Sequence, residues 1–450
     1  MGSSPKSPYL IPNVRLFIQF RVLFNARFYY PVFSILFLDF GLTLSQFAIL
    51  NAVWAATIVV CEVPSGALAD TIGRRNLLVF AGSLMVAEIA LWVFVPRDDL
   101  GLLFWIFVLN RILSGMAEAA ASGADEALAY DSLKQEGDIG QWGQVLERQI
   151  QVQSAGFVVA MTLGGVIYDP VLLQKIADFF NIGMTFSRDS TLRLPIYLTM
   201  ATAILTLLTT LKMREMPTDN GIETREGESI AVAFRLVWLA GRWIFRTPFV
   251  LGLILFGLLY DSVTRMMLTM ASQYYRVIDV PESLFGILGS SLALLGFVMP
   301  GIARRLSEKR SPIFNMLFSA TLIAIGLVGM TFTWPWVGIL PALLLFCNMF
   351  LIGFFLSHYL NQVTSSDQRA TVLSFKGLFL NLGYGMIGIF YSFLLAFLRW
   401  RTADSTPGLA EEVIKNLVFV DSLPWFCGYF GFCLLLLLLF FTRSMRHQPR

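Results

Sequence analysis

Charged side chains are scarce in this chain. Only 14% of its 450 residues are Asp, Glu, Lys or Arg, whereas 56% are hydrophobic. A water-soluble protein of this composition has too few polar side chains to cover its surface. The forty phenylalanines and the mean hydropathy of +0.69 also indicate a membrane protein. The net charge of +3 is too small to favour a nucleic-acid partner.

Cysteine and histidine are also rare. The four cysteines lie in apolar runs, at Cys61, Cys347, Cys427 and Cys433. We expect them to be small buried side chains and not a disulfide or metal framework. With two histidines in the chain, we expect no metal site. The sequence also lacks a Gly-x-x-x-x-Gly-Lys-Ser/Thr phosphate loop, so we expect no nucleotide cofactor. We also expect that the protein is not an enzyme.

Apolar runs of about 20 residues, the length that crosses a bilayer, recur along the whole chain. We predict that they are helices, because the hydrocarbon core offers no hydrogen-bond partner to the backbone. The twelve predicted spans lie near residues 17–40, 44–66, 76–95, 102–123, 149–167, 193–211, 248–270, 283–302, 312–332, 336–358, 371–398 and 423–441. The first run has no small-residue cleavage site, so we expect no cleaved signal peptide.

The distribution of basic residues predicts the orientation. Most of the 33 Lys and Arg residues fall on the cytoplasmic side if both termini are cytoplasmic. The longest polar interruption follows six spans and precedes six others, as in transporters built from two bundles. We therefore predict an all-α membrane protein, a monomer in a bacterial inner membrane, with six-helix bundles at 1–211 and 248–450 and a cytoplasmic linker at 212–247. Residues 230–245 are either an amphipathic helix on the membrane or a solvated linker helix.

A short polar hinge at 62–78 separates two long apolar runs. Six of its residues, Gly66, Leu68, Asp70, Gly73, Arg74 and Arg75, stand in the order Gly-x-Leu-x-Asp-x-x-Gly-Arg-Arg. This order resembles the loop between the second and third spans of the Major Facilitator Superfamily of solute transporters. Asp70 could accept from the free amides at a neighbouring helix start. Gly73 permits a tight reversal of the chain, and the arginines favour the cytoplasmic side.

Two further stretches carry the resemblance. In residues 109–119, Arg111 and the pair Ser114-Gly115 match a family stretch that is linked to proton coupling. Residues 156–165 resemble the glycine-rich stretch of drug–proton antiporters, although Ala160 and Met161 replace its central Gly-Pro. Within the superfamily, the motifs are therefore most similar to those of drug or metabolite–proton antiporters.

Four charged residues inside the spans are candidates for proton coupling: Glu118, Arg111, Asp261 and Glu88. Charged residues at membrane depth are costly and face a partner or water. Glu118 lies two helical turns from Arg111, so the two either form a structural ion pair or act as proton carrier and modulator. Arg265 lies four residues from Asp261 and favours its ionised form. Glu88 could snorkel, pair locally or carry a proton.

In the family, spans one, four, seven and ten line a central cavity. The resemblance therefore implies one substrate site with the polar residues Asn25, Arg27, Tyr29, Tyr30, Arg265, Asn348 and His358. Pro31 is expected to bend the first span. The groups that can be placed at the site are three arginines, Arg27, Arg111 and Arg265, and two acids, Glu118 and Asp261. This balance suggests an anionic, zwitterionic or amphipathic ligand surrounded by aromatic rings.

Three acids, Asp125, Glu126 and Asp131, follow the fourth span. They either form a solvated helix end or supply a partner for Arg74 or Arg75. In the family such pairs are thought to lock the outward-facing state.

The resemblance implies secondary active transport by alternating access, and we expect proton-coupled export of a small organic molecule. Uptake by symport, facilitated diffusion, a lipid or lysolipid flippase and a non-transporting sensor remain open. An apolar lateral opening would favour a lipid, and a closed polar cavity would favour a soluble metabolite.

Overall fold

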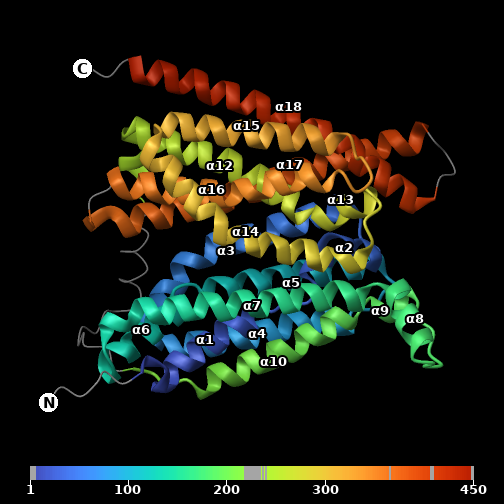
Figure 1. Ribbon diagram of the computed structural model, residues 1–450, viewed down its shortest axis with the longest axis horizontal. Coiled ribbons are helices and arrows are strands. Elements are labelled where there is room, and N and C mark those ends of the chain that lie inside the picture. Colours follow the sequence, from blue (N-terminus) through green and yellow to red (C-terminus); the bar gives the residue numbers. More distant parts are fainter. Residues whose placement is uncertain are drawn as a thin grey trace. The chain divides into compact units, whose positions relative to one another are not determined.

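The computed structural model describes residues 7–216, 235, 238, 241–363, 366–405 and 410–446, and these residues are helical except at turns and loops (Figure 1). The predicted all-α fold is confirmed. Most of the predicted linker helix at 230–245 lies outside the described residues.

Eleven stretches of the described chain are long and apolar enough to cross a membrane. They are built on the helices α3 (Leu44–Ile72), α4 (Arg74–Phe94), α5 (Leu100–Ala121), α7 (Trp142–Tyr168), α10 (Leu194–Lys212), α12 (Pro248–Thr269), α14 (Glu282–Lys309), α15 (Pro312–Thr331), α16 (Ile339–Val363), α17 (Ser366–Ser405) and α18 (Glu411–Arg446). They correspond to the predicted spans two to twelve.

The first predicted span is not one continuous helix. Its residues form α1 (Pro12–Asn25), the 3-10 helix η2 (Tyr30–Val32) and α2 (Phe33–Phe40). Pro31, where a bend was expected, lies in η2, and residues 26–29 before it are not helical. With 14 and 8 residues, α1 and α2 are each shorter than the roughly 20 residues that cross a bilayer, so the first predicted span is divided into separate helices.

The remaining helices are short and lie between or beside the spans. They are η1 (Pro8–Leu10), α6 (Ala124–Glu136), η3 (Ile139–Gln141), α8 (Pro170–Phe179), α9 (Arg188–Thr191) and α13 (Ala271–Val277). Gly123 separates α5 from α6 with φ of +76°, a conformation that glycine adopts without strain.

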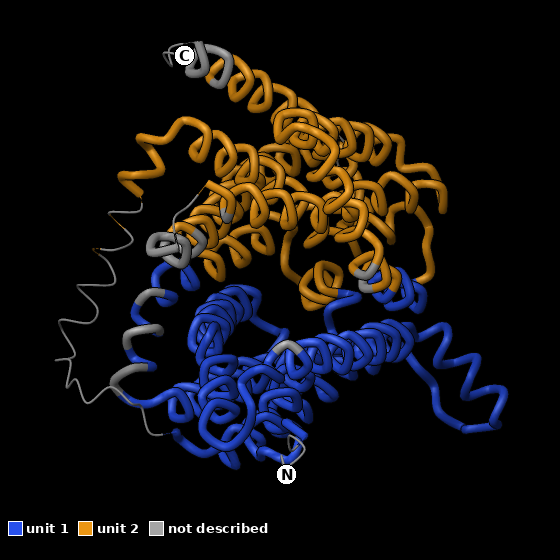
Figure 2. The backbone as a smooth tube through the Cα atoms, turned by 60° about the vertical axis from the view of Figure 1, so that its left-hand side comes forward, with its two compact units in different colours: residues 1–32, 57–233, 282–290 blue, residues 33–56, 234–281, 291–450 orange. Residues whose placement is uncertain are grey.

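Two compact units appear when the chain is divided by its contacts (Figure 2). Unit 1 contains residues 1–32, 57–233 and 282–290, and unit 2 contains residues 33–56, 234–281 and 291–450. Residues 33–56 precede the linker in sequence but pack with helices that follow it. The predicted division into bundles on either side of 212–247 stays a prediction.

Candidate functional site

The break in the first span lies between α1 and η2 in unit 1. Its backbone bonds to α10 side chains in place of helical partners: Phe28 N donates to Thr199 Oγ1 over 3.0 Å, and Thr202 Oγ1 donates to Ala26 O over 3.1 Å. Gly164 of α7 packs directly on the backbone of Phe28. A Cβ atom added to Gly164 would lie 1.8 Å from the carbonyl oxygen of Phe28. Neighbouring helices therefore satisfy an irregular backbone at membrane depth.

This break places Arg27 against Glu88 of α4. The two side chains are 3% and 1% exposed, and Arg27 Nη1 donates to Glu88 Oε1 over 2.5 Å. Arg27 also donates to Tyr29 Oη over 2.9 Å, and Asn110 of α5 donates to the Glu88 backbone carbonyl over 2.9 Å. Of the three roles open to Glu88, local pairing is the one observed. Asn110 was not predicted, although a polar residue beside Arg111 in an apolar run was a usable signal.

Aromatic rings surround the Arg27–Glu88 pair. The guanidinium lies 5.5 Å from the Phe24 ring, and Trp92 packs on Tyr29 with ring centroids 4.7 Å apart. Tyr29 is buried, whereas Tyr30 is 38% exposed. The two tyrosines predicted for the substrate cavity therefore have different surroundings.

Arg111 and Glu118 both lie on α5 but differ in burial. Arg111 is buried, together with Ser114, whereas Glu118 is exposed. The Glu118 side chain makes no hydrogen bond or ion pair to any residue that the structure describes. It lies within electrostatic range of Arg27 and Glu88. Glu118 is thus an accessible carboxylate beside a buried ion pair.

A second charged site lies in unit 2, between α12 and α17. Arg265 Nη2 pairs with Asp261 Oδ2 at 2.5 Å, as expected from their spacing on one helix face. Arg265 Nη1 donates to Asn381 Oδ1 over 2.8 Å, and the guanidinium lies 5.2 Å from the Tyr384 ring. Tyr384 Oη in turn lies 2.9 Å from Thr269 Oγ1. Asn381 and Tyr384 of α17 were not predicted, because the family resemblance implies a cavity lined by spans one, four, seven and ten.

Lys376 belongs to the same region. It lies on α17, is half-buried and is within electrostatic range of Asp261. Its ammonium group makes no hydrogen bond or ion pair within the described part of the chain. From the sequence, Lys376 was assigned to the cytoplasmic side. Asn381 and Tyr384 lie three residues apart, close to one helical turn, which was the available signal for this side of α17.

Three other residues predicted for the substrate cavity hydrogen-bond within their own helix or to no described residue. Asn25 Nδ2 donates to Arg21 O in its own helix over 2.8 Å. His358 on α16 lies 3.0 Å from the Gln362 amide. Asn348, also on α16, is fully buried, and neither polar atom of its side chain has a partner among the described residues. The prediction that all the cavity residues surround one substrate site stays a prediction.

The turn between α3 and α4 meets the acids of α6 in unit 1. Arg74 Nη1 forms an ion pair with Asp131 Oδ2, the pairing expected for one of these acids. Asp125 and Glu126 instead pair with Arg21 of α1, at 2.5 and 3.2 Å. Asp125 and Glu126 lie at the start of α6, where this helix contacts α1, whereas Asp131 lies more than one helical turn further along α6. The acids therefore pair with different arginines.

The start of α4 is capped by Glu215, which follows α10. Its carboxylate oxygens accept from the backbone N–H groups of Arg74 and Arg75 over 3.1 and 2.8 Å. Gly73 has φ of +90°, and an added Cβ would lie 2.7 Å from Glu215 Oε2. Asp70 was predicted to accept from the amides at a neighbouring helix start; its side chain, like the surroundings of Gly66, lies outside the described residues.

Arg75 binds the end of α10 through two backbone carbonyls. Its Nε donates to Met213 O over 2.9 Å, and its Nη2 donates to Leu211 O over 3.2 Å. A cation at a helix C-terminus stabilises the exposed carbonyls. The two hinge arginines therefore have different partners: Arg74 binds a carboxylate and Arg75 binds backbone.

Within unit 2, α2 packs on α13 through reciprocal serine contacts. Ser34 N donates to Ser272 Oγ, and Gln273 N donates to Ser34 Oγ, both over 3.0 Å. One helical turn beyond Ser272, Arg276 makes two hydrogen bonds of 2.9 Å to the Asp39 carboxylate. These contacts join the first predicted span to α13, the short helix that follows the seventh predicted span, and were not predicted from the sequence.

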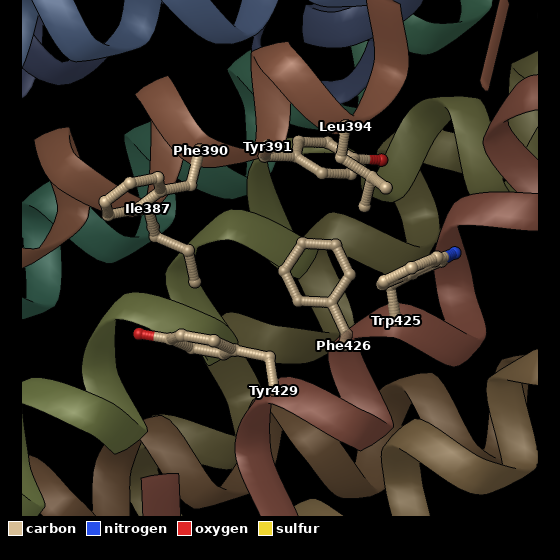
Figure 3. Close-up of a pocket in the computed structure, with 7 residues that line it drawn as sticks. All are labelled: Ile387, Phe390, Tyr391, Leu394, Trp425, Phe426 and Tyr429. Atoms are coloured by element: carbon tan, nitrogen blue, oxygen red, sulfur yellow. The ribbon is translucent and has the colours of Figure 1, made fainter. Parts of the chain in front are cut away.

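An aromatic cavity of about 270 Å³ lies between α17 and α18 (Figure 3). It is lined by Ile387, Phe390, Tyr391, Leu394, Trp425, Phe426 and Tyr429. The hydroxyl of Tyr391 lies 2.9 Å from Ser422 Oγ, so its polar end is satisfied. The lining suits an apolar ring or chain and contains no carboxylate or cationic side chain.

Comparison with known proteins gives one family. A sequence profile of the Major Facilitator Superfamily matches residues 16–386. The MFS-type transporter ppzB of Metarhizium rileyi (strain RCEF 4871) is 31% identical over 118 residues. That match spans 26% of this chain and 22% of the relative, so less than a quarter of the relative is covered.

Solved transporters share the fold. The nucleoside transporter NupG has a TM-score of 0.69 at 13% identity, covering 97% of this chain and 99% of its own. A bacterial homolog to the human lysosomal transporter Spinster, in an inward-facing and occupied conformation, has a TM-score of 0.67 at 15% identity, with 99% and 98% coverage. A D-xylose–proton symporter has a TM-score of 0.63 at 12% identity, with 93% and 97% coverage. At these identities the likeness concerns the fold alone.

Proposed function

Because the chain belongs to the Major Facilitator Superfamily, we propose that it is a secondary active transporter that exports a small organic solute in exchange for protons. Its apolar helices make it an integral membrane protein. The proposed location is a bacterial inner membrane with both termini in the cytoplasm, following the distribution of basic residues. Transport proceeds by alternating access and needs no catalytic residue or cofactor.

The observation that carries the coupling proposal is the unequal pairing of the three candidate acids, Glu88, Glu118 and Asp261. Glu88 and Asp261 each bind an arginine at 2.5 Å. Glu118 is exposed and has no hydrogen-bond or ion-pair partner among the described residues. Protonating Glu88 or Asp261 would leave an arginine without its counter-charge, which is unfavourable at membrane depth. Glu118 can gain and lose a proton without that penalty, so it is the proposed carrier.

The charged site on α12 and α17 supports an anionic or zwitterionic solute. Lys376 supplies a half-buried ammonium group that no described side chain binds, and Arg265 is held in place by Asp261 and Asn381. A carboxylate or phosphate of the solute could bind Lys376, while Tyr384 offers an aromatic face beside Arg265.

The test begins with thermal unfolding of the purified protein against a panel of organic anions, zwitterions, lipophilic drugs and lysolipids, since a ligand of the folded state raises its stability. The stabilising compound is then loaded into proteoliposomes, and its flux is measured with and without a pH gradient. A flux that responds to the pH gradient supports the proposal. Equal flux with and without the gradient would exclude proton coupling.

The alternative of a lipid or lysolipid substrate is favoured by the aromatic cavity of Figure 3. Its ring-lined surface matches an acyl chain better than a hydrophilic metabolite. If lysolipids stabilise the protein and Trp425→Ala removes that effect, the substrate is amphipathic. If stabilisation by a small anion survives Trp425→Ala and is lost in Lys376→Gln, the charged site binds the substrate.

A further inference from the structure

The segment between α7 and α10 forms an ordered arm. We use "arm" for α8 and the loop that follows it, residues 170–187. In Figure 1, α8 lies at the end of unit 1 remote from the N-terminus and turns away from the line of α7; Figure 2 shows the same arm projecting from unit 1. None of its residues belongs to the predicted or proposed transport sites.

The base of the arm is fixed to the end of a membrane-spanning helix. Asp169, the one residue between α7 and α8, caps α8 by accepting from Val171 N and Leu172 N over 2.9 and 3.2 Å. At the other end of the arm, Arg188 donates to Tyr168 O over 3.0 Å and lies 4.6 Å from the Tyr168 ring. Both ends therefore meet at the last residue of α7, which places α8 at the level where α7 leaves the bilayer.

The arm has a defined internal structure. Asn181 adopts φ of +52° and ends α8, with Ile182 N donating back to Ala177 O over 2.8 Å, the arrangement of a Schellman cap. Gln174 ties the returning loop to the helix, because its Oε1 accepts from Phe186 N over 2.8 Å. The arm is therefore a folded unit of one helix and a returning loop, and the side chains of α8 point to defined sides of the helix.

The helix α8 is amphipathic. At 100° per residue, most of its apolar side chains share one face; its polar side chains, Gln174, Lys175 and Asp178, share the other, together with the exposed Val171. The apolar face is Leu172, Leu173, Ile176, Phe179 and Phe180. Phe179 is 80% exposed and Phe180 65% exposed, and Ile182 and Met184 of the loop are also exposed. An ordered apolar face of this kind is unfavourable in water and marks a contact with an apolar partner.

We propose that the arm lies in the bilayer interface, with Ile176, Phe179 and Phe180 inserted among the lipids of one leaflet. The partner is the membrane itself, since α8 starts one residue after a span and is held at that level by Asp169 and Arg188. The arm carries one basic and one acidic residue, Lys175 and Asp178. Its attachment therefore depends on apolar burial and not on anionic lipid.

The test measures the depth of single positions in proteoliposomes. Spin labels are placed on cysteines at 176, 179 or 180, with matched controls at the exposed positions 171, 175 and 178 on the opposite face of the same helix. The four native cysteines are replaced. Labels on the apolar face should collide more with lipid-soluble oxygen than with a water-soluble nickel chelate, and the labels on the opposite face should show the reverse order. The pattern should be the same in phosphatidylcholine and after addition of phosphatidylglycerol.

Other outcomes would overturn the proposal. Nickel access at all six positions would place the arm in water, and exclusion of both reagents from the apolar face would show that protein, such as a second copy, covers it. If the apolar-face labels enter the lipid only when phosphatidylglycerol is present, the attachment of the arm depends on anionic lipid, and the proposal is wrong. The unmodified protein provides an independent measurement, since a photoreactive probe carried by lipid acyl chains should label residues 176–184. Absence of adducts there, with labelling of the spans, would also overturn the proposal.

Discussion

The guanidinium of Arg27 donates to the carboxylate of Glu88 over 2.5 Å, although 61 residues separate them in sequence. Both side chains are buried, and the pair exists because the first span is unwound where Arg27 emerges. Removing one partner leaves a buried charge without compensation, whereas removing both leaves none. This difference gives the first prediction.

Glu88→Leu should destabilise the protein by about 3–5 kcal/mol, the usual cost of breaking one side of a buried pair. Arg27→Met combined with Glu88→Leu should recover most of that loss. The measurement is thermal or denaturant unfolding in detergent, with Glu136→Leu, at an exposed helix end, as the control. A double variant no more stable than Glu88→Leu would mean that other contacts of Arg27 stabilise this region.

Gly164→Ala tests the break itself. A Cβ at this position would lie 1.8 Å from Phe28 O, so the break or α7 would have to move. We expect a loss of roughly 1–3 kcal/mol, typical of overpacking. Gly353→Ala is the matched control, because an added Cβ there meets no atom within 4 Å, and it should be neutral or slightly stabilising in a helix. Equal unfolding temperatures for the two variants would show that Gly164 is not needed for the break.

The sequence predicted the break only in part. Pro31 indicated a bend, since proline removes a helical hydrogen bond. The position of the unwound residues depends on Thr199, Thr202 and Gly164, which lie on helices far away in sequence. Hydropathy responds to local composition and cannot report such contacts.

The charged residues show the same limit. Asp261 and Arg265 were predicted to meet because they lie four residues apart on one helix, and they do. The partner of Glu88 was left open, and Asn381 was missed, because each bonds to a different helix. The spacing of residues in the sequence therefore predicted the contact within one helix. It did not predict the contacts between helices, which depend on tertiary packing.

The ion pair of Arg74 and Asp131 should influence the conformational balance of the transporter more than its stability, because both side chains are partly exposed. Arg74→Gln and Asp131→Asn should each slow transport, and the double variant should be no slower than the singles. Transport of the stabilising compound into proteoliposomes is the measurement. Additive losses in the double variant would show that the two residues act independently.

Ser34 and Ser272 test whether α2 and α13 must part during transport. Their hydroxyl oxygens lie 2.6 Å apart, so Ser34→Cys with Ser272→Cys should form a disulfide under mild oxidation. Oxidation should stop transport, and a reductant should restore it. Each single cysteine variant, oxidised in the same way, is the control. Full transport by the cross-linked protein would show that this contact persists through the cycle.

Glu118→Gln tests the proton carrier. The amide keeps the size of the side chain but cannot exchange a proton, so coupling should fail while the conformational change remains. Uphill accumulation driven by a pH gradient should vanish, and exchange of labelled for unlabelled compound at equal concentrations should persist. Glu136→Gln, an exposed acid outside the spans, should retain both activities. If driven accumulation survives in Glu118→Gln and disappears in Asp261→Asn, the carrier is Asp261, and the arginine beside it does not hold it ionised. If both variants still accumulate the compound, and the pH gradient still drives the parent, Glu88 is the remaining candidate acid to test.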